Sequence, residues 1–173
     1  MSLSAKIVKH LEKLKVKYKP VKHRTVYTAY DAAATMRAKL GEIAKTLHIV
    51  ADKKHFLAVV PASHMLDLGK LKKLLKAKKT EIAKEKYMIK VFGIKKGSVV
   101  PFAGLYKDVG VWVDRGFSRA KRVFVSGGTF QDSLEMKVKD FLRAAGGVVA
   151  NFAVKKPAAK KGKGLPAGRQ GKK

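Results

Sequence analysis

Helical spacing of apolar residues recurs along the chain. Residues placed along one helical face predict an N-terminal helix, with Ser4 in position to cap it: Ile7, Val8, Leu11 and Leu14. Similar spacing predicts further helices over 31–39, after Asp67, from about 80 to 92, and up to Gly146-Gly147.

Shorter runs rich in β-branched and aromatic residues predict strands. Residues 45–50 and 55–61 are two such runs, and the polar segment 51–54 between them predicts a hairpin. A short strand at 17–23 is interrupted by Pro20. The remaining predicted strands lie at 109–113, 122–125 and 148–154. Because strands and helices alternate irregularly, we expect a single α+β domain with a mixed sheet rather than a doubly wound fold.

The C-terminal segment 155–173 differs from the rest of the chain in composition. It carries eight basic residues and no acidic residue, and it has almost nothing to bury. We therefore expect a folded domain over residues 1–154 and a disordered basic tail over 155–173. Two roles stay open for this tail, which either adds nonspecific affinity for nucleic acid or is inert.

Net charge makes a polyanion the natural partner. The 173 residues include 40 Lys+Arg and 12 Asp+Glu, a formal charge of +28, and without the tail 32 basic residues still face 12 acidic ones. Lysine and arginine gain affinity for phosphates by releasing counterions. The excess of lysine favours recognition of backbone or shape over reading of bases. A halo of solvated lysines is the competing interpretation.

Several classes of protein and site are disfavoured by what the sequence lacks. The absence of cysteine excludes disulfides, thiol nucleophiles, iron–sulfur clusters and cysteine-containing zinc sites. We find no two-histidine zinc pattern, Walker motif, dinucleotide fingerprint or Gly-x-Ser-x-Gly elbow, so we expect no metal and no cofactor. No run approaches the roughly 18 apolar residues of a membrane span, and the N-terminus does not read as a signal peptide. We therefore expect a soluble, cytoplasmic protein.

Lys45 is the first residue with candidate chemistry. It shares strand parity with Leu47 and Ile49, the predicted core face, and so is expected to point inward at the end of the strand. A lysine in such a place can hold a phosphate or stabilise a developing oxyanion. Alternatively, its long side chain carries the charge back to water.

Two glycine-containing segments and one histidine complete the candidates. In the segment 97–102, Gly97 permits close approach of a ligand to the backbone, and Pro101 stiffens the exit. The segment Ser126-Gly127-Gly128 follows a predicted strand and forms either an anion-binding nest or a tight turn. His23 stands at the end of a strand, where it either lines a pocket or has a surface or capping role.

Taken in order, these segments resemble the YbaK/prolyl-tRNA synthetase-associated domain family of freestanding aminoacyl-tRNA editing deacylases. The resemblance covers about residues 5–154, and its order and spacing are specific although no single motif is. The matching segments are His23 followed by 28–33, then 42–47, 57–62, 66–68, 97–101 and 125–128.

The resemblance implies a mixed sheet, partly barrel-like and flanked by helices, and hydrolysis of the ester that joins a mischarged amino acid to tRNA. It makes Lys45 and Gly97 the catalytic residues. Lys45 would position the terminal adenosine or its phosphate and stabilise charge, and the backbone at Gly97 would hold the reacting end. No cofactor and no protein nucleophile are implied, because water or a substrate group attacks. The substrate-binding residues implied are Ser98, Pro101, Ser126, Gly127, Gly128 and His23.

The resemblance also bears on the substrate and on partners. The segment 97–102 is closer to the branch of the family that acts on alanyl-tRNA, whereas Ser126-Gly127-Gly128 is closer to the branch that acts on cysteinyl-tRNA. We therefore expect a small amino acid such as Ala or Cys, on tRNA-Pro or tRNA-Cys, with an aminoacyl-tRNA synthetase as a candidate partner. A noncatalytic tRNA- or RNA-binding module on the same fold and a general basic nucleic-acid-binding protein remain the alternatives.

Overall fold

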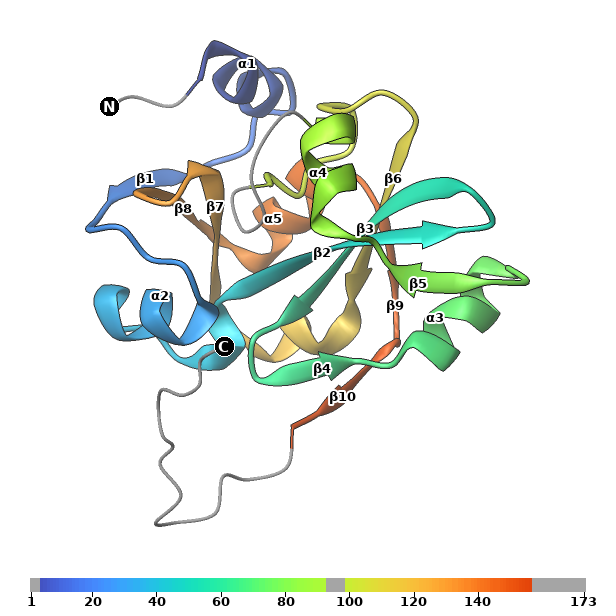
Figure 1. Cartoon of the computed structure of the whole chain (residues 1–173). Helices are drawn as coiled ribbons and strands as arrows, with labels where there is room; N and C mark the ends of the chain where they lie inside the picture. The colour runs from blue at the N-terminus through green and yellow to red at the C-terminus, as the bar shows by residue number, and fades with distance from the viewer. Residues whose placement is uncertain (1–3, 93–98, 157–173) are drawn as a thin grey trace.

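A five-stranded mixed sheet forms the centre of the computed structural model, which describes residues 4–92 and 99–156 (Figure 1). Its strand order is β5-β2-β3-β6-β9. The strands are β2 (Ala44–Ala51), β3 (Lys54–Pro61), β5 (Thr80–Ile82), β6 (Val109–Asp114) and β9 (Val148–Ala150). β2 pairs antiparallel with β3 and β5, whereas the pairs β3–β6 and β6–β9 are parallel. The predicted hairpin at 51–54 is confirmed.

Two smaller antiparallel sheets accompany the central one. The first has the order β1-β8-β7, formed by β1 (Lys19–Lys22), β8 (Asp132–Lys137) and β7 (Arg122–Thr129). The second pairs β4 (His64–Leu66) with β10 (Ala153–Lys155). Pro20 lies in β1, for which β8 is the only paired strand within the described chain. An edge strand can accommodate a residue without an N–H group, which explains how a proline fits here.

The two larger sheets meet at one point. Ile43, just before β2, forms an isolated parallel bridge with Phe124 of β7. The described strands do not close into a barrel. The structure therefore confirms a single α+β domain with mixed sheets flanked by helices.

Helices cover the sheets on several sides, and two of them begin at side-chain caps, of which the Ser4 cap was predicted. The side chain of Ser4 accepts a hydrogen bond from the Ile7 N–H (3.3 Å), and Asp67 accepts one from the Lys70 N–H (3.1 Å). No helix in the described parts of the chain is long and apolar enough to cross a bilayer. The α-helices are α1 (Ala5–Lys13), α2 (Ala29–Met36), α3 (Leu68–Leu75), α4 (Glu85–Phe92) and α5 (Val138–Ala145), and the 3₁₀ helices are η1 (Leu40–Glu42) and η2 (Arg115–Arg119).

Three apolar clusters hold these layers together. The largest joins α1 and α5 to the central and three-stranded sheets through residues such as Leu11, Phe141 and Val111. A second packs α2 against Ile43 and Phe124. The third lies beneath α3 and is described by its buried members: Ile49, Ala58, Val60, Leu71 and Phe152.

The structure corrects four expectations. The helix predicted from about residue 80 begins at Glu85, because Thr80–Ile82 instead adds β5 to the edge of β2. β4 and β8 were not predicted. The strand predicted at 148–154 is divided into β9 and β10, which belong to different sheets.

The carboxylate of Asp114 accounts for that division. Asp114 is buried at the end of β6, and its Oδ1 accepts hydrogen bonds from the N–H groups of Phe152 and Ala153, each at 2.9 Å. Its Oδ2 accepts a third, from the Gly116 N–H, at 2.8 Å. These bonds take the chain out of the central sheet and into the pairing with β4.

The C-terminal boundary is described only in part. β10 ends at Lys155, and the Lys156 N–H donates to the Ser63 carbonyl at 3.1 Å. The rest of the predicted basic tail, residues 157–173, lies outside the described residues, so the predicted tail stays a prediction.

Candidate functional site

The junction between the two larger sheets brings candidate residues from distant segments together. Ile43 and Phe124 form a parallel bridge there, and Lys45 and Ser126 each lie two residues beyond it on their own strands. Side chains two residues apart in a strand share a face. The side chain of Lys45 is therefore on the same face as that of Ile43, and the side chain of Ser126 is on the same face as that of Phe124. The two segments run parallel at the bridge.

Lys45 is exposed, so the prediction that its side chain points into the interior is wrong. Its strand parity is as predicted, because Ile49 on the same face is completely buried. Burial along this face falls from Ile49 through the partly buried Leu47 to Lys45. The start of β2 lies outside the apolar cluster under α3, so the ammonium group of Lys45 stays hydrated.

The segment Ser126-Gly127-Gly128 lies within the second half of β7, where the strand is irregular. Gly128 has φ of +103°, and its N–H donates to the Ser126 Oγ at 3.1 Å. The pairing of β7 with β8 shifts register between Ser126 and Thr129. A glycine is needed at such a φ because a Cβ would meet the neighbouring backbone. This irregular stretch of β7 therefore depends on glycine at position 128, and the Ser126 side chain holds it, whereas the sequence predicted either a nest or a tight turn after the strand.

Gly128 also connects this stretch to the segment that carries Pro101. A Cβ built on Gly128 would lie 3.8 Å from a methyl group of Val100. Val100 and Pro101 are buried, and the Val100 N–H donates to the Tyr106 hydroxyl at 3.0 Å. Burial raises the pKa of that hydroxyl, which keeps it protonated. Gly97 and Ser98, the other candidates of this segment, lie outside the described residues.

His23 directly follows β1 of the three-stranded sheet, and Ser133 connects it to Ser126. Its Nε2 is 2.9 Å from the Ser133 Oγ, and its Nδ1 is 2.7 Å from the Arg24 carbonyl. Ser133 in β8 is the Cα partner of Ser126 in β7. Sequence reasoning missed Ser133 because it missed β8, although the alternation of Leu134 and Met136 with polar residues was the available signal.

A groove of about 350 Å³ is lined by residues of this sheet and by Thr35 and Met36 at the end of α2. Arg122 in its wall donates to the carboxylates of Glu42 (3.2 Å) and Glu135 (3.3 Å). The hydrogen bond to Glu42 raises the pKa of this guanidinium, so it stays charged. The lining includes His23, as one interpretation of the sequence predicted, with Met36, Phe124 and several charged residues.

The arrangement can bind and orient an anionic ligand. The junction offers the exposed ammonium group of Lys45 and a glycine-containing stretch, and the groove offers polar and charged side chains. Across the described residues, no three His, Asp or Glu side chains gather in a way that would hold a metal ion. Of the eight predicted site residues, the structure relates Lys45, His23, Pro101 and the Ser126-Gly127-Gly128 segment to this one region.

Comparisons with known proteins identify the family and the fold. The family model of the aminoacyl-tRNA editing domain matches residues 23–144. One similar solved structure, a hypothetical protein called APE2540, is 24% identical, has a TM-score of 0.79, and is aligned over 86% of this chain and 99% of its own. Another is provisionally described as a trans-editing enzyme for prolyl-tRNA synthetase. It is 26% identical with a TM-score of 0.73, aligned over 90% of this chain and 100% of its own.

No curated protein sequence matches the chain. The family match nevertheless covers more than half of the residues and includes Lys45, Pro101, the Ser126-Gly127-Gly128 segment and His23. The resemblance inferred from the ordered motifs is confirmed at this level. The chain belongs to the family of YbaK-type aminoacyl-tRNA editing domains.

Proposed function

We propose that this protein is a trans-editing hydrolase that removes the amino acid from mischarged aminoacyl-tRNA. The observation that carries the proposal is that Lys45 and Ser126 each follow by two residues the bridge between Ile43 and Phe124, within a chain of the editing-domain family. The similar structure described as a trans-editing enzyme for prolyl-tRNA synthetase supports the same reaction class. Such a role places the protein in the cytoplasm and makes a synthetase a candidate partner.

The chemistry requires positioning and charge stabilisation rather than a protein nucleophile. An aminoacyl ester is already activated, so fixed geometry and stabilisation of the oxyanion suffice for hydrolysis. Water attacks the ester carbonyl carbon, since attack by the neighbouring ribose hydroxyl would only move the acyl group along the ribose and leave it on the tRNA. When water attacks, the tetrahedral intermediate collapses by breaking the bond to the ribose oxygen. The ribose oxygen takes a proton, and the amino acid leaves as a carboxylate.

The residues divide these tasks among them. The ammonium group of Lys45 binds the terminal adenosine or its phosphate and offsets the negative charge that develops on the ester oxygen. The backbone at Gly97 holds the reacting end, with Ser98 beside it and Pro101 fixing the loop. Ser126, Gly127 and Gly128 line the pocket for the amino acid, and His23 binds at its edge. Lys45 can act without desolvation, since its side chain is exposed to solvent.

The amino acid we propose is small, Ala or Cys, carried on tRNA-Pro or tRNA-Cys. Gly127 and Gly128 contribute no side chains to a pocket, which suits a small substrate. Discrimination by size alone is limited, because one methylene changes binding by about 1–3 kcal/mol. We therefore expect activity on more than one small aminoacyl group.

The test is release of labelled amino acid from a panel of substrates. The panel includes alanyl-tRNA-Pro, cysteinyl-tRNA-Pro, cysteinyl-tRNA-Cys, and seryl- and threonyl-tRNAs. Wild type is compared with Lys45→Ala and with Lys139→Ala, an equal loss of charge at an exposed lysine of α5. We expect hydrolysis of one or two members, lost in Lys45→Ala and kept in Lys139→Ala.

The opposite outcome is equally informative. If a folded wild-type protein that binds tRNA releases no amino acid above the buffer rate from any member, the editing proposal fails for these substrates. A noncatalytic tRNA-binding module on the same fold would then account for the chain. If binding depended wholly on residues 155–173, a general basic nucleic-acid-binding protein would be the better description.

A further inference from the structure

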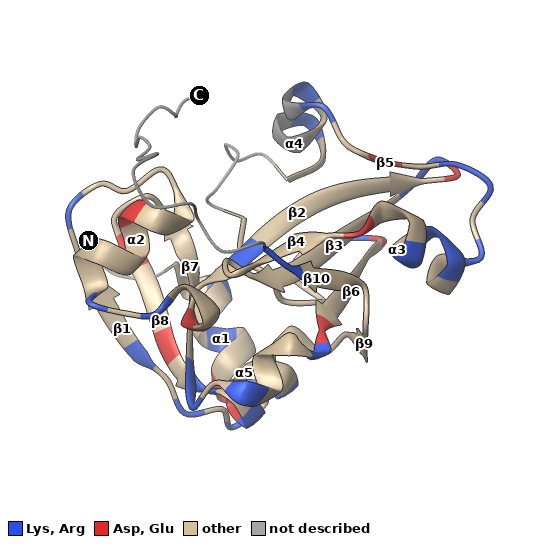
Figure 2. Cartoon of the chain, turned by 90° about the horizontal axis from the view of Figure 1, so that it is seen from below, with Lys and Arg blue, Asp and Glu red and all other residues tan. Residues whose placement is uncertain are grey.

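Eight exposed lysines gather at one end of the molecule, which we call the lysine end. They come from the β2–β3 turn, from α3 and from the segment between α3 and β5, and Figure 2 shows the basic residues concentrated on α3 and the loop that follows it. Residues 52–81 contain these eight lysines and only three acidic residues. The lysines are Lys53, Lys54, Lys70, Lys72, Lys73, Lys76, Lys78 and Lys79.

The lysine end is built by specific contacts. Asp52, in the β2–β3 turn, accepts hydrogen bonds from the N–H groups of Lys78 (2.9 and 3.1 Å) and Lys79 (2.9 Å). In return, the Asp52 N–H donates to the Lys79 carbonyl at 3.0 Å. The register pairs Ala51 with Thr80 directly behind this contact. Two lysine pairs far apart in sequence, 53–54 and 78–79, are thereby held next to each other.

The three acidic residues of this segment offset only part of the charge of its eight lysines, and Asp52 interacts electrostatically with Lys78 and Lys72. The Asp52 carboxylate is engaged by the two backbone N–H groups, which lower its pKa, and Asp67 caps the opposite end of α3. None of the ion pairs found among the described residues includes a lysine of this end. The positive charge is therefore available to a partner.

Helix stability alone does not explain the lysines. Leu71 anchors α3 in the apolar cluster beneath it, which leaves the lysines on the outer surface. Lysines in the last turn interact favourably with the helix dipole, but like charges three or four residues apart repel. Lys70 with Lys73 and Lys72 with Lys76 form such pairs, and the lysines of the turn gain nothing from the dipole. The lysines of this end repel one another, and a bound polyanion would reduce this repulsion.

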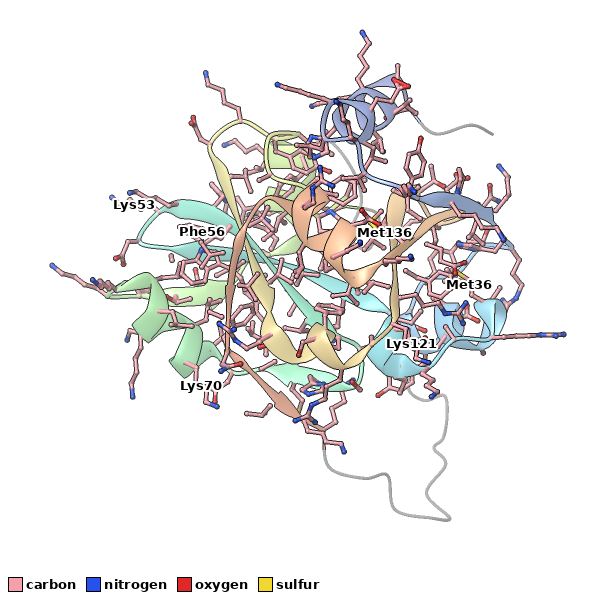
Figure 3. All side chains as sticks on the ribbon, turned by 180° about the vertical axis from the view of Figure 1, so that it is seen from behind. Met36, Lys53, Phe56, Lys70, Lys121 and Met136 are labelled. Atoms are coloured by element: carbon pink, nitrogen blue, oxygen red, sulfur yellow. The ribbon has the colours of Figure 1, made fainter. Side chains whose placement is uncertain are left out.

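The lysine end lies far from the sheet junction. β2 runs from Lys45 to Ala51 before reaching the turn, a length of about 20 Å at 3.3 Å per residue. In Figure 3, Lys53 and Lys70 lie on one side of the molecule, and Met36 and Lys121 lie on the other. A single aminoacyl nucleotide cannot contact both regions. An extended polyanion can, and lysine is suited to backbone phosphates rather than base edges.

We propose that the lysine end binds the phosphate backbone of the tRNA body while the 3′ end of the same tRNA reaches the sheet junction. This inference rests on the proposed function, because it assigns a second contact to the same substrate. The lysine end then supplies affinity and orientation, and takes no part in the reaction at the ester.

The test removes three charges from α3 in Lys70→Gln/Lys72→Gln/Lys73→Gln. The matched control is Lys121→Gln/Lys137→Gln/Lys139→Gln, three exposed lysines outside the lysine end. Glutamine keeps helix propensity close to that of lysine, so α3 should form in the variant, which circular dichroism verifies. The affinity for folded, uncharged tRNA-Pro is measured from 50 to 200 mM salt for each protein.

Each lost phosphate contact lowers the slope of log affinity against log salt by about 0.7–0.9. Three contacts therefore change the fall in affinity over this fourfold salt range by roughly 20- to 40-fold. We expect the α3 variant to show this flatter dependence and the control to match wild type. An equal effect in both variants, or none in either, would overturn the inference and leave the lysines as a general solvated charge.

A second arm separates this inference from the proposed function. Deacylation is measured on full-length aminoacyl-tRNA and on its 3′-terminal aminoacylated CCA trinucleotide. We expect the α3 variant to lose about tenfold or more in kcat/KM on the tRNA and less than twofold on the trinucleotide. Loss on both substrates would contradict a role limited to the tRNA body. If wild type hydrolyses neither substrate, the proposed function fails, and the binding series still decides whether the lysine end holds tRNA.

Discussion

Replacing Gly128 with alanine tests whether glycine is needed at the sheet junction for its positive φ or for lack of space for a Cβ. The Cβ of the new residue would lie 3.4 Å from the Ile7 Cδ1 and 3.8 Å from the Val100 Cγ2, which are ordinary contacts with side-chain methyl groups. The backbone, however, has φ of +103°, where an L-residue is strained. The cost should therefore be conformational, about 1–3 kcal/mol.

Urea denaturation and thermal melting measure this cost. A loss of this size corresponds to a Tm lower by roughly 2–12 °C for a chain of this length. Gly41→Ala is the control, because its Cβ would meet only the Ser63 Oγ, at 3.6 Å, and its φ is unremarkable. We expect that variant to change the free energy of unfolding by less than about 1 kcal/mol.

The comparison of the two variants decides the point. The Gly128→Ala backbone N–H can still donate to Ser126, so a lost hydrogen bond would not explain a large effect. Equal free energies of unfolding for the two alanine variants would refute the argument that this stretch of β7 demands a positive φ. Deacylation by the folded Gly128→Ala protein should also fall, since relaxing the φ moves the end of β7 away from Val100.

Two further predictions concern stability. Gly147→Ala would place a Cβ 2.2 Å from the Val111 carbonyl oxygen, a backbone atom that cannot rotate away. We therefore expect urea denaturation to show a free energy of unfolding lower by about 3 kcal/mol or more. A variant as stable as wild type would contradict this close packing of β9 on β6. Burial, with a smaller contribution from His55, lowers the pKa of His48 to about 4, so the folded state resists protonation. The stability associated with neutral His48 is present above the unfolded pKa near 6.5 and is lost as pH falls toward 4, at up to about 1.4 kcal/mol per pH unit. In His48→Phe this part of the pH dependence should disappear, and an unchanged slope would show that His48 does not cause it.

Sequence signals within a short window predicted the elements that form from neighbouring residues. Ser4 caps α1 as predicted, the helix expected after Asp67 forms as α3, and the β2–β3 hairpin forms around its polar turn. The segment at Thr80 was assigned to a helix because its partner, the edge of β2, is distant in sequence. Pairing between distant segments cannot be read from periodicity in a short window.

The sequence identified the residues of the candidate site, but it did not determine their exposure or their contacts. The ordered motifs identified the family, and the structure relates most of the predicted residues to one region. For Lys45 the sequence left two alternatives, an inward-pointing side chain or one that carries its charge to water, because parity gives the face of a strand and not how deeply each end is buried. The exposure of Lys45 agrees with the second alternative. Ser133 was missed for a related reason, since its contact with His23 exists only once β1 and β8 have paired.

The hydrogen bonds that hold the end of the described chain determine where this protein can be joined to another. Asp114 fixes Phe152 and Ala153 from inside the fold, and Lys156 makes the last backbone contact, to Ser63. A fusion partner or affinity tag attached beyond Lys156 leaves every one of these bonds in place. One attached before Phe152 would strand a buried carboxylate without its donors, and the resulting chimera should express poorly.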